Sequence, residues 1–520
     1  AIQTISNRFQ RSYEKLPSPV VTVSAALFAS YLVLKYANRS QKRPPHQVPA
    51  VPYTLPFFGH GIEMNRDPYA FIQRCKEQYG PVFEIYTFGQ KMIVVTGKHV
   101  VECFRVGEEY LDFQEGVKDL LPTAHVVDLS YSKMKQQEGP QYPIAKNPLI
   151  RLVRNNYKSH QLSAFQDRLI DSVQQSLDKD LVFQPGENST IVDANTFFQK
   201  LVARIGVQLF AGKKYAESEP LIQAFADYAL SMFRAGIALN VLPTPVANFI
   251  LRRYLSVGKN IDTIMSEVTP HVTSIKEEED QFGQSKPDDF MHMMLQTPGA
   301  DDHIQTPEET AFWLKDIAFA SIHTTSTFTS FAAHDLSDRP DIQDLLRKEI
   351  KETIEQHGEL TPELTAKMPI MDSFLRESLR LQSDFVGFRH KAMKDTVLQG
   401  GLTIPKGSTV GLSVYDAHLD PEIQDIGSSN VPLSEIDPLR FVGQRSKKST
   451  AVGTDFLIFG VGAHSCPGRY LASQEIRYIL SCLLQQYDIS TTTKDGKRAP
   501  NQLALVSTFI INCFGCINSI

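Results

Sequence analysis

The sequence predicts a mainly α-helical protein with a minor β portion, in which one large domain follows a short N-terminal region. Three observations predict this class. Helical patterning dominates from about residue 97 to about residue 390. Two β-rich runs precede it, and short strands, turns and one more helix follow from residue 395 onward. No internal repeat or low-complexity linker divides residues 57–520.

The composition narrows the possible functions. The chain has 520 residues and a formal charge of −5, and no basic surface dominates it, so binding to nucleic acid is not expected. Its six cysteines are too few and too scattered for a disulfide scaffold. Cys513 and Cys516 form a CxxC pair, but no second pair or histidine cluster lies near them, which argues against a metal or redox role.

The N-terminal region, residues 1–43, is expected to contain a membrane anchor. Residues 18–36 read SPVVTVSAALFASYLVLKY, with no charge before Lys35, and as a helix they would span roughly 28 Å. The heavier basic flank lies on the C-terminal side, which places the rest of the chain in the cytosol. We therefore expect a single-pass protein of the endoplasmic reticulum membrane. A cleaved signal peptide is the alternative, although its apolar region is usually shorter.

Two segments come next. Residues 44–56, PPHQVPAVPYTLP, are proline-rich and predict an extended, fairly stiff hinge between the anchor and the body of the protein. Val82–Tyr86 and Met92–Thr96 are apolar runs of β-forming residues, and Phe88-Gly89-Gln90 lies between them. This arrangement predicts a β-hairpin.

The residues from Thr306 to Glu309 are typical of a helix start, with a capping threonine, a proline at the first helical position and a glutamate at the third. The helical pattern then continues without Gly or Pro to about Leu336, which is roughly 30 residues or about 45 Å. Such a helix is expected to cross the whole domain. Residues 320–325, Ala-Ser-Ile-His-Thr-Thr, lie in its middle, where polar groups need partners or a function.

Residues 459–469, FGVGAHSCPGR, form the strongest motif in the chain. Gly460 and Gly462 allow the backbone to turn tightly and to approach a flat cofactor closely. His464 and Arg469 would add positive charge, which favours a deprotonated cysteine between them.

Pro467 suits the first position of a helix that continues through residues 472–483. Cys466 would then lie at a helix N-terminus, where the helix dipole favours a thiolate. The alternative is a buried structural cysteine in a glycine-rich turn. That alternative fits a lone Cys-Pro-Gly better than it fits the whole pattern.

This stretch resembles the haem-binding signature of the cytochrome P-450 superfamily, Phe-x-x-Gly-x-(Arg/His)-x-Cys-x-Gly. The matching positions, which the resemblance places at the cofactor, are Phe459, Gly462, His464, Cys466 and Gly468. The resemblance implies the cytochrome P-450 fold, a haem b cofactor (iron protoporphyrin IX), and Cys466 as the axial ligand of its iron. It covers nearly the whole chain, the anchor included.

Two further elements lie where this superfamily has them. Glu377 and Arg380, inside FLRESLRL, match its Glu-x-x-Arg helix, and their spacing places them on one helix face. Residues 437–441, DPLRF, resemble its Pro-x-Arg-Phe element. The resemblance implies that Glu377, Arg380 and Arg440 form a structural triad behind the haem. Buried ion networks of this kind specify geometry more than they stabilise.

The middle of the long helix resembles the superfamily's (Ala/Gly)-Gly-x-(Asp/Glu)-Thr-Thr, with Ser321 replacing the second glycine and His323 replacing the acid. The resemblance implies a catalytic group in which Thr324 positions dioxygen, His323 helps to relay protons and Thr325 lies beside them. The alternative is that the threonines bond back to the i−4 carbonyls and His323 only fills space. This variant looks like a group of fungal oxygenases that oxidise terpenoids and steroids.

The sequence offers more than one group that could bind the haem propionates. The family's Trp-x-x-x-Arg is absent, because the only tryptophan is Trp313. Arg154 or Arg151 is the expected replacement for its arginine. Arg389 and His390, just after the Glu-x-x-Arg helix, are further candidates.

We therefore expect a haem-thiolate monooxygenase that oxidises an apolar, terpenoid- or steroid-like molecule with O₂ in fungal secondary metabolism. Electrons would come from a separate NADPH-dependent cytochrome reductase, since no flavin or nicotinamide domain fits beside the haem domain, and we expect a monomer. The substrate pocket would draw on residues 110–130, 312–317 and 385–388. The alternatives are a haem-thiolate isomerase or dehydratase that acts without O₂, and a non-catalytic haem sensor.

Basic residues near the cysteine loop suggest a docking surface for the reductase. The five expected members are Arg445, Lys447, Lys448, Arg469 and Arg477. Charges of one sign on a surface steer a partner of the opposite sign. An ordinary solvated surface is the alternative.

Overall fold

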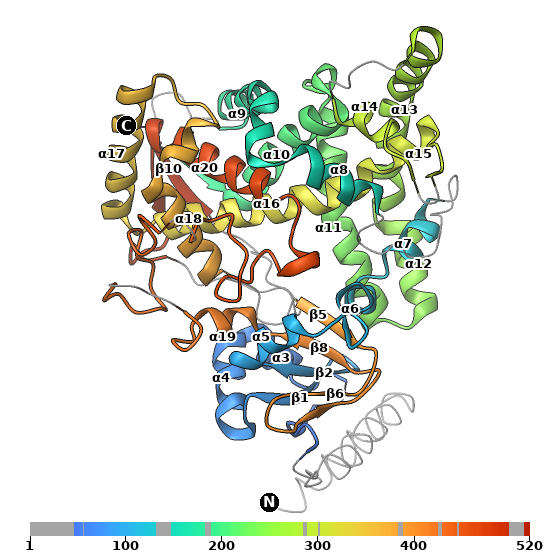
Figure 1. Ribbon diagram of the computed structural model, residues 1–520, viewed down its shortest axis with the longest axis vertical. Coiled ribbons are helices and arrows are strands. Elements are labelled where there is room, and N and C mark those ends of the chain that lie inside the picture. Colours follow the sequence, from blue (N-terminus) through green and yellow to red (C-terminus); the bar gives the residue numbers. More distant parts are fainter. Residues whose placement is uncertain are drawn as a thin grey trace, which may run out of the picture.

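The computed structural model describes residues 46–55, 57–131, 147–181, 189–283, 289–299, 302–382, 388–424, 429–444, 447–498 and 514–519. Figure 1 shows a larger helical part and a smaller part that contains a β-sheet. The expected class, mainly α with a minor β portion, is confirmed. Residues 18–36, the expected anchor, lie outside the described residues. No helix within the described ranges is long and apolar enough to cross a membrane.

The smaller part is organised around a five-stranded sheet of order β1-β2-β8-β5-β3 (Figure 1). Its strands are β1 (Val82–Thr87), β2 (Gln90–Val95), β3 (Leu111–Asp112), β5 (Phe388–Ala392) and β8 (Thr409–Leu412). β1 and β2 form the expected antiparallel hairpin. The turn residues Phe88 and Gly89 have φ values of 48° and 85°, the positive values that tight hairpin turns require. β2 also pairs in parallel with β8, so distant parts of the chain meet in this sheet.

The described part of the proline-rich segment, residues 46–55, lies against this sheet. The Val51 N–H donates to the Glu84 carbonyl at 2.8 Å, and the Glu84 N–H donates to the Pro49 carbonyl at 2.7 Å. The side chain of Val48 is buried in the core under the sheet. This end of the expected hinge is therefore held by the body of the protein.

The larger part is helical, and α16 (Leu314–Leu336) runs through its middle (Figure 1). Its 23 residues span about 35 Å. The helices that contact it are α10 (Ala194–Gly206), α11 (Glu219–Val241), α13 (Val257–Phe282), α17 (Pro340–His357), α18 (Pro369–Leu381) and α20 (Arg469–Gln486). Apolar side chains from these helices form one continuous buried core.

The long helix expected from Thr306 is divided in two. α15 (Pro307–Phe312) begins with the expected capping box, in which the Glu309 N–H donates to Thr306 Oγ1 at 3.2 Å and the Thr306 N–H donates to Glu309 Oε2 at 2.8 Å. Trp313 then interrupts the helix, and its indole N–H donates to Gln305 Oε1 at 2.7 Å. The prediction of one uninterrupted helix is wrong at this residue, because the Trp313 N–H donates to the Thr310 carbonyl three residues back, at 3.3 Å, and a helical pattern does not reveal such a local change.

The remaining elements complete both parts. Near the five-stranded sheet lie α3 (Gly61–Arg66), α4 (Pro68–Tyr79), α5 (Lys98–Arg105), α6 (Phe113–Leu120), α19 (Val414–His418) and the two-stranded sheet of β6 (Thr396–Val397) and β7 (Thr403–Ile404). The helical part also contains α7 (Thr123–Ser130), α8 (Pro148–Asn156), α9 (Gln166–Asp180), α12 (Thr244–Tyr254) and α14 (Phe290–Leu295). A three-stranded sheet joins β4 (Ser189–Asp193), β10 (Phe514–Ser519) and β9 (Tyr487–Thr491). A short π-helix is formed by η3 (Val207–Ala211). The described 3₁₀-helices are η2 (Ser159–Phe165), η4 (Lys213–Tyr215), η6 (Leu364–Lys367) and η7 (Gly462–His464).

α20 contains a buried carboxyl group, Glu475, and we expect Glu475→Gln to remove a loss of stability that occurs as the pH rises from about 4.5 to about 8. Burial raises the pKa of Glu475 to about 8 from its ordinary value of 4.5. The folded state therefore keeps the proton up to about pH 8, whereas the unfolded state releases it near pH 4.5. Wild-type stability thus falls as pH rises between these values, by about 1.4 kcal/mol per unit.

Denaturant unfolding at pH 6 and pH 8 checks this expectation. From pH 6 to pH 8 the stability of the wild type should fall by about 2 kcal/mol relative to that of the variant. Glu355→Gln, at an exposed position of α17, is the matched control and should leave the pH dependence unchanged. If the stability of Glu475→Gln depended on pH in the same way as that of the wild type, Glu475 would not titrate in this range.

Candidate active site

The loop before α20 holds Cys466 in a tight turn. The Cys466 N–H donates to the Phe459 carbonyl at 2.7 Å, which closes the loop. Gly460 and Gly462 have φ values of 68° and 64°, which residues with a Cβ rarely adopt. A Cβ at Gly460 would also lie 3.1 Å from the carbonyl oxygen of His464. Both glycines are therefore required by the backbone of this loop, as the motif predicted.

The sulfur of Cys466 lies close to the start of α20. Burial raises the pKa of the Cys466 thiol, and the backbone N–H groups of Gly468 and Arg469 together with the Arg469 guanidinium lower it. Donors for a thiolate are thus present, but burial has the larger effect. A metal cation bound to the sulfur would supply the positive charge that keeps it deprotonated.

The start of α20 differs from the expectation. The helix begins at Arg469, so Pro467 lies in the turn before it and not at its first position. The guanidinium of Arg469 folds back and donates from Nη1 to the Cys466 carbonyl at 2.9 Å. This bond fixes the last turn of the loop against the helix.

A cavity of about 260 Å³ opens beside this loop. It is lined by Gly462 and His464 from the loop, by His390 from β5, and by side chains that include Phe113. The centroid of the Phe113 ring lies 5.5 Å from that of His390 and 6.4 Å from that of His464. The structure thus brings together three of the residues that the sequence assigned to the cofactor.

His464 gives a test of whether these residues fit a haem. Its Nε2 forms an ion pair with the carboxylate of Glu108. Its Nδ1 is buried and has no hydrogen-bond partner among the residues that the structure describes. This unpartnered ring nitrogen offers a polar contact to a carboxylate of a bound group, and a haem propionate is one. Together with the sulfur and its N–H donors, these residues fit a haem.

The other candidate propionate ligands do not line this cavity. Arg389 is buried on β5 next to His390, and neighbouring residues on a strand point to opposite faces. Arg151 and Arg154 lie on α8. Of the four propionate candidates, Arg151, Arg154, Arg389 and His390, only His390 lines the cavity, where it lies together with His464 of the loop.

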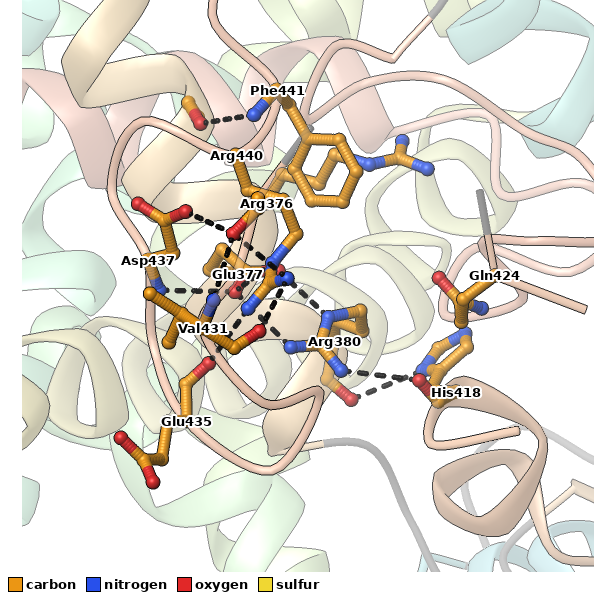
Figure 2. A network of polar contacts seen from close by, with 12 residues as sticks. Arg376, Glu377, Arg380, His418, Gln424, Val431, Glu435, Asp437, Arg440 and Phe441 are labelled. Atoms are coloured by element: carbon orange, nitrogen blue, oxygen red, sulfur yellow. Dashed lines mark hydrogen bonds and ion pairs between the residues drawn. The ribbon is translucent and has the colours of Figure 1, made fainter. Parts of the chain in front are cut away.

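Glu377, Arg380 and Arg440 form one buried network, shown in Figure 2. Glu377 Oε1 accepts from Arg380 Nε at 2.7 Å, and Glu377 Oε2 accepts from Arg380 Nη2 at 3.1 Å and from Arg440 Nε at 2.9 Å. α18 places the first two residues one turn apart on one face, as their spacing predicted. The structure therefore brings the three predicted triad residues into direct contact.

Arg440 also organises the chain that precedes it. Its remaining N–H groups donate to three backbone carbonyls at 3.0–3.2 Å, those of Val431, Pro432 and Glu435. In addition, the Asp437 N–H donates to Glu377 Oε2 at 3.2 Å. A segment without regular structure is thus fixed by one buried guanidinium and one buried carboxylate.

Sequence reasoning missed two buried neighbours of this triad, Arg376 and His418 (Figure 2). The Arg376 guanidinium lies 4.6 Å from the ring centroid of Phe441 and 4.1 Å from that of Phe456, and it donates to Asp455 at 3.0 Å. Burial lowers the pKa of Arg376 to about 10. Its position beside the triad glutamate was the only sequence feature that pointed to it. His418 had no such feature, because it is a lone histidine.

The middle of α16 has one open face. Ala320 and Thr324 are exposed, although most of their neighbours on this helix are buried, and residues one turn apart share a helix face. The Thr324 hydroxyl donates to the Ala320 carbonyl at 2.8 Å, which is the i−4 bond of the non-catalytic interpretation. Thr325 is buried. The structure therefore separates the two threonines and presents Thr324 alone on the open face.

His323 points toward another helix. Its ring centroid lies 4.9 Å from that of Phe233 on α11. Burial lowers the pKa of His323 to about 4, so its imidazole is neutral near neutral pH. Adjacent residues leave a helix about 100° apart, so His323 and Thr324 point in different directions.

The expected docking cations are mostly engaged inside the protein. Lys447 and Arg477 form ion pairs with aspartates, and Arg469 binds the cysteine loop. Lys448 is exposed, and Arg445 lies outside the described residues. Among the described members of the expected docking group, Lys448 is therefore the exposed cation without an ion pair to another described residue, while Lys447, Arg469 and Arg477 contact groups of the protein itself.

Comparisons with known proteins extend these observations. The model of the family described as Cytochrome P450 matches residues 49–510. Cytochrome P450 monooxygenase 103 of Postia placenta is 24% identical over 483 residues, 90% of this chain and 92% of that protein. Cytochrome P450 monooxygenase paxP of Penicillium paxilli is 29% identical over 322 residues, 60% of this chain and 61% of that protein. The solved structure of retinoic acid-bound cyanobacterial CYP120A1 matches with a TM-score of 0.66 at 20% identity, over 92% of this chain and 100% of that one.

Proposed function

The chain belongs to the cytochrome P450 family and is a monooxygenase, and on this premise we propose that it oxidises an apolar, terpenoid- or steroid-like molecule in fungal secondary metabolism. The electrons come from a separate NADPH-dependent reductase. The observation that carries the proposal is the Cys466 loop, which is closed by a hydrogen bond and directs two N–H groups toward the sulfur. The altered motif at Ser321 and His323, together with the fungal origin of the relatives, supports the substrate class and the setting.

Turnover with purified components tests the proposal. The protein, a reductase, NADPH and O₂ are incubated with extracts that contain candidate apolar substrates, and an oxygenated product that depends on all four components is expected. Product formed without reductase or O₂ would favour an isomerase or a dehydratase. A protein that shows a haem spectrum but converts none of the substrates would favour a sensor.

Cys466 would hold the iron of a haem b, and His464 would bind one of its propionates, with His390 beside it. Bound there, the haem supplies the iron at which O₂ is activated, and the thiolate donates electron density to that iron. The chain's own residues keep the sulfur in place, shield it from water and orient the substrate. The triad of Glu377, Arg380 and Arg440 is proposed to fix the core behind this site.

The substrate is proposed to lie along the open face of α16. Asp316 stands on this face two turns before Thr324, about 12 Å away along the helix. Its carboxylate is 35% exposed and accepts a hydrogen bond from Lys315 at 2.6 Å. An apolar molecule with a hydroxyl group at that distance from the oxidised carbon would match both ends of this face. Residues 383–387, which contain most of the expected 385–388 part of the pocket, lie outside the described residues.

We expect His323→Ala and Thr324→Ala to release reducing equivalents as hydrogen peroxide. Thr324 lies on the open face, and neutral His323, although its ring packs against α11, can accept a proton at one ring nitrogen and donate one from the other, so both are proposed to support proton delivery to dioxygen. Product formed per NADPH consumed should fall several-fold in each variant, with haem and substrate binding intact. His323→Asp should restore part of the yield. A normal yield in His323→Ala would leave the histidine with a packing role against Phe233 only.

Residues 18–36 are proposed to anchor the protein in the endoplasmic reticulum membrane, with the catalytic domain in the cytosol. Support comes from the apolar side chains that are exposed at the end of the hinge. These are Leu55, Phe57, Phe58 and Ile62. Exposed aromatic and aliphatic groups in one place suit the interface of a bilayer.

Removing residues 1–43 is expected to make the protein extractable from microsomes by alkaline carbonate, because the proposed anchor lies in the removed part. The haem spectrum should stay unchanged, since residues 46–519 contain every group of the candidate site. Weak residual binding through the exposed apolar side chains Leu55, Phe57, Phe58 and Ile62 is compatible with this outcome. Full-length protein in the soluble fraction would rule out the anchor.

A further inference from the structure

His418 ends α19, is fully buried, and lies beside the triad (Figure 2). It is bonded to Arg380 twice. Arg380 Nη1 donates to the His418 carbonyl at 3.1 Å, and His418 Nδ1 donates to the Arg380 carbonyl at 3.0 Å. On the other side of the ring, the Leu457 N–H donates to His418 Nε2 at 2.9 Å. One side chain therefore connects the triad helix to the backbone of the segment that leads to Cys466.

These partners fix where the proton of the ring lies. A backbone N–H can only donate, so Nε2 carries no proton, and a carbonyl can only accept, so Nδ1 carries it. Burial lowers the pKa of His418 to about 3, which keeps the ring neutral near neutral pH. The ring also stacks on Phe456, with centroids 5.9 Å apart. Position, tautomer and orientation of His418 are all determined by its surroundings.

Leu457 is where this contact reaches the cysteine loop. Its carbonyl accepts the Gly460 N–H at 2.8 Å, and the Phe459 carbonyl accepts the Cys466 N–H at 2.7 Å. The Leu457 N–H is held by a side chain of α19 at the start of this chain of bonds, and the Cys466 carbonyl is held by Arg469 of α20 at its end. Loss of the His418 acceptor would leave a buried amide unpaired at the start of the loop.

We infer that His418 is a positioning residue for Cys466. Its Nε2 fixes the position of the Leu457 amide. The two hydrogen bonds inside the loop then fix the position of Cys466, and so of its sulfur, relative to Leu457. The two ring nitrogens have different tasks. Nδ1 attaches the ring to the triad helix, and Nε2 attaches the loop to the ring. The inference rests on the proposed role of Cys466 as the haem ligand.

Two variants separate these tasks. In His418→Gln the longer side chain can place its carbonyl oxygen near the former Nε2 position, so it keeps an acceptor for Leu457 and loses the donor to Arg380. In His418→Asn the shorter amide can donate to Arg380 but cannot reach Leu457. Each variant loses one buried hydrogen bond, so both should lower the unfolding temperature by similar amounts.

The ferrous carbon-monoxide adduct of the full-length holoprotein gives the readout. In His418→Asn the red-shifted Soret band that reports thiolate ligation should decay about tenfold faster than in wild type, which corresponds to ~1.4 kcal/mol. In His418→Gln the decay should stay close to wild type. Equal decay in the two variants, or no change in either, would reduce His418 to a structural role in the core.

Hydrogen exchange of the wild-type holoprotein keeps the inference testable if neither variant folds. The peptide that contains Leu457 should show a strongly protected amide, and rapid exchange there would overturn the inference. Failure of the proposed haem ligation would be recognised separately. In that case wild type itself would show no red-shifted band, before any His418 variant is compared.

Discussion

Replacing Cys466 by histidine is expected to abolish the red-shifted Soret band of the ferrous carbon-monoxide adduct while some haem stays bound. An imidazole can ligate haem iron, but it does not donate electron density as a thiolate does, and the red shift depends on that donation. Reductase-supported oxidation should be lost with the band. The measurement is a reduced carbon-monoxide difference spectrum together with the haem content per protein.

Cys75→Ala is the matched control for this experiment. Cys75 is also a free cysteine, but it is buried under the β1–β2 hairpin. Its replacement should leave the position of the band unchanged. A red-shifted band that survives in Cys466→His would mean that another group binds the iron, and the assignment of the loop would be wrong.

Glu377→Ala is expected to prevent the accumulation of folded holoprotein. The variant leaves the Arg380 and Arg440 guanidiniums buried next to each other without the carboxylate that both of them contact. Removal of one partner of a buried ion pair costs about 3–5 kcal/mol, and here one carboxylate serves two cations. The whole stability of a folded domain is only about 5–15 kcal/mol.

The yield of haem-containing protein and the thermal unfolding midpoint check this prediction. Glu63→Ala is the control, because Glu63 pairs with Arg74 at the surface, at 2.5 Å, with both side chains about half exposed. Exposed pairs contribute at most about 1 kcal/mol, so this variant should behave like wild type. If Glu377→Ala gave a normal yield and midpoint, the triad would not be required for the fold.

The sequence predicted those parts of the site whose residues are close together in the chain. The glycines that shape the Cys466 loop and the one-turn spacing of Glu377 and Arg380 are local, so their geometry follows from backbone rules. Arg440 was placed beside them only by the family resemblance. It follows Glu377 by 63 positions, and no local rule connects the two.

The same limit explains what the sequence did not predict. His418 is 38 positions from Arg380 and 39 from Leu457, and its role exists only when both are folded around it. The break at Trp313 is a local change of backbone hydrogen bonding, at a residue whose indole donates to Gln305 in the loop before the helix. The sequence suggested that Lys447 lies on a docking surface, but in the structure it forms an ion pair with Asp455. Side-chain contacts that form in the fold, rather than sequence patterns, decide these cases.

The pairing of β2 with β8 has a consequence for how the protein is made. Val95 lies next to Leu412 in this sheet, so the hairpin is synthesised roughly 300 residues before its parallel neighbour. At about 5–20 residues per second, a ribosome needs ~15 to 60 s for that interval. During this time the edge of β2, with Ile93, Val94 and Val95, has no strand to pair with, and an apolar strand edge of this kind promotes aggregation. A nascent chain halted before residue 409 should therefore need a chaperone to stay soluble.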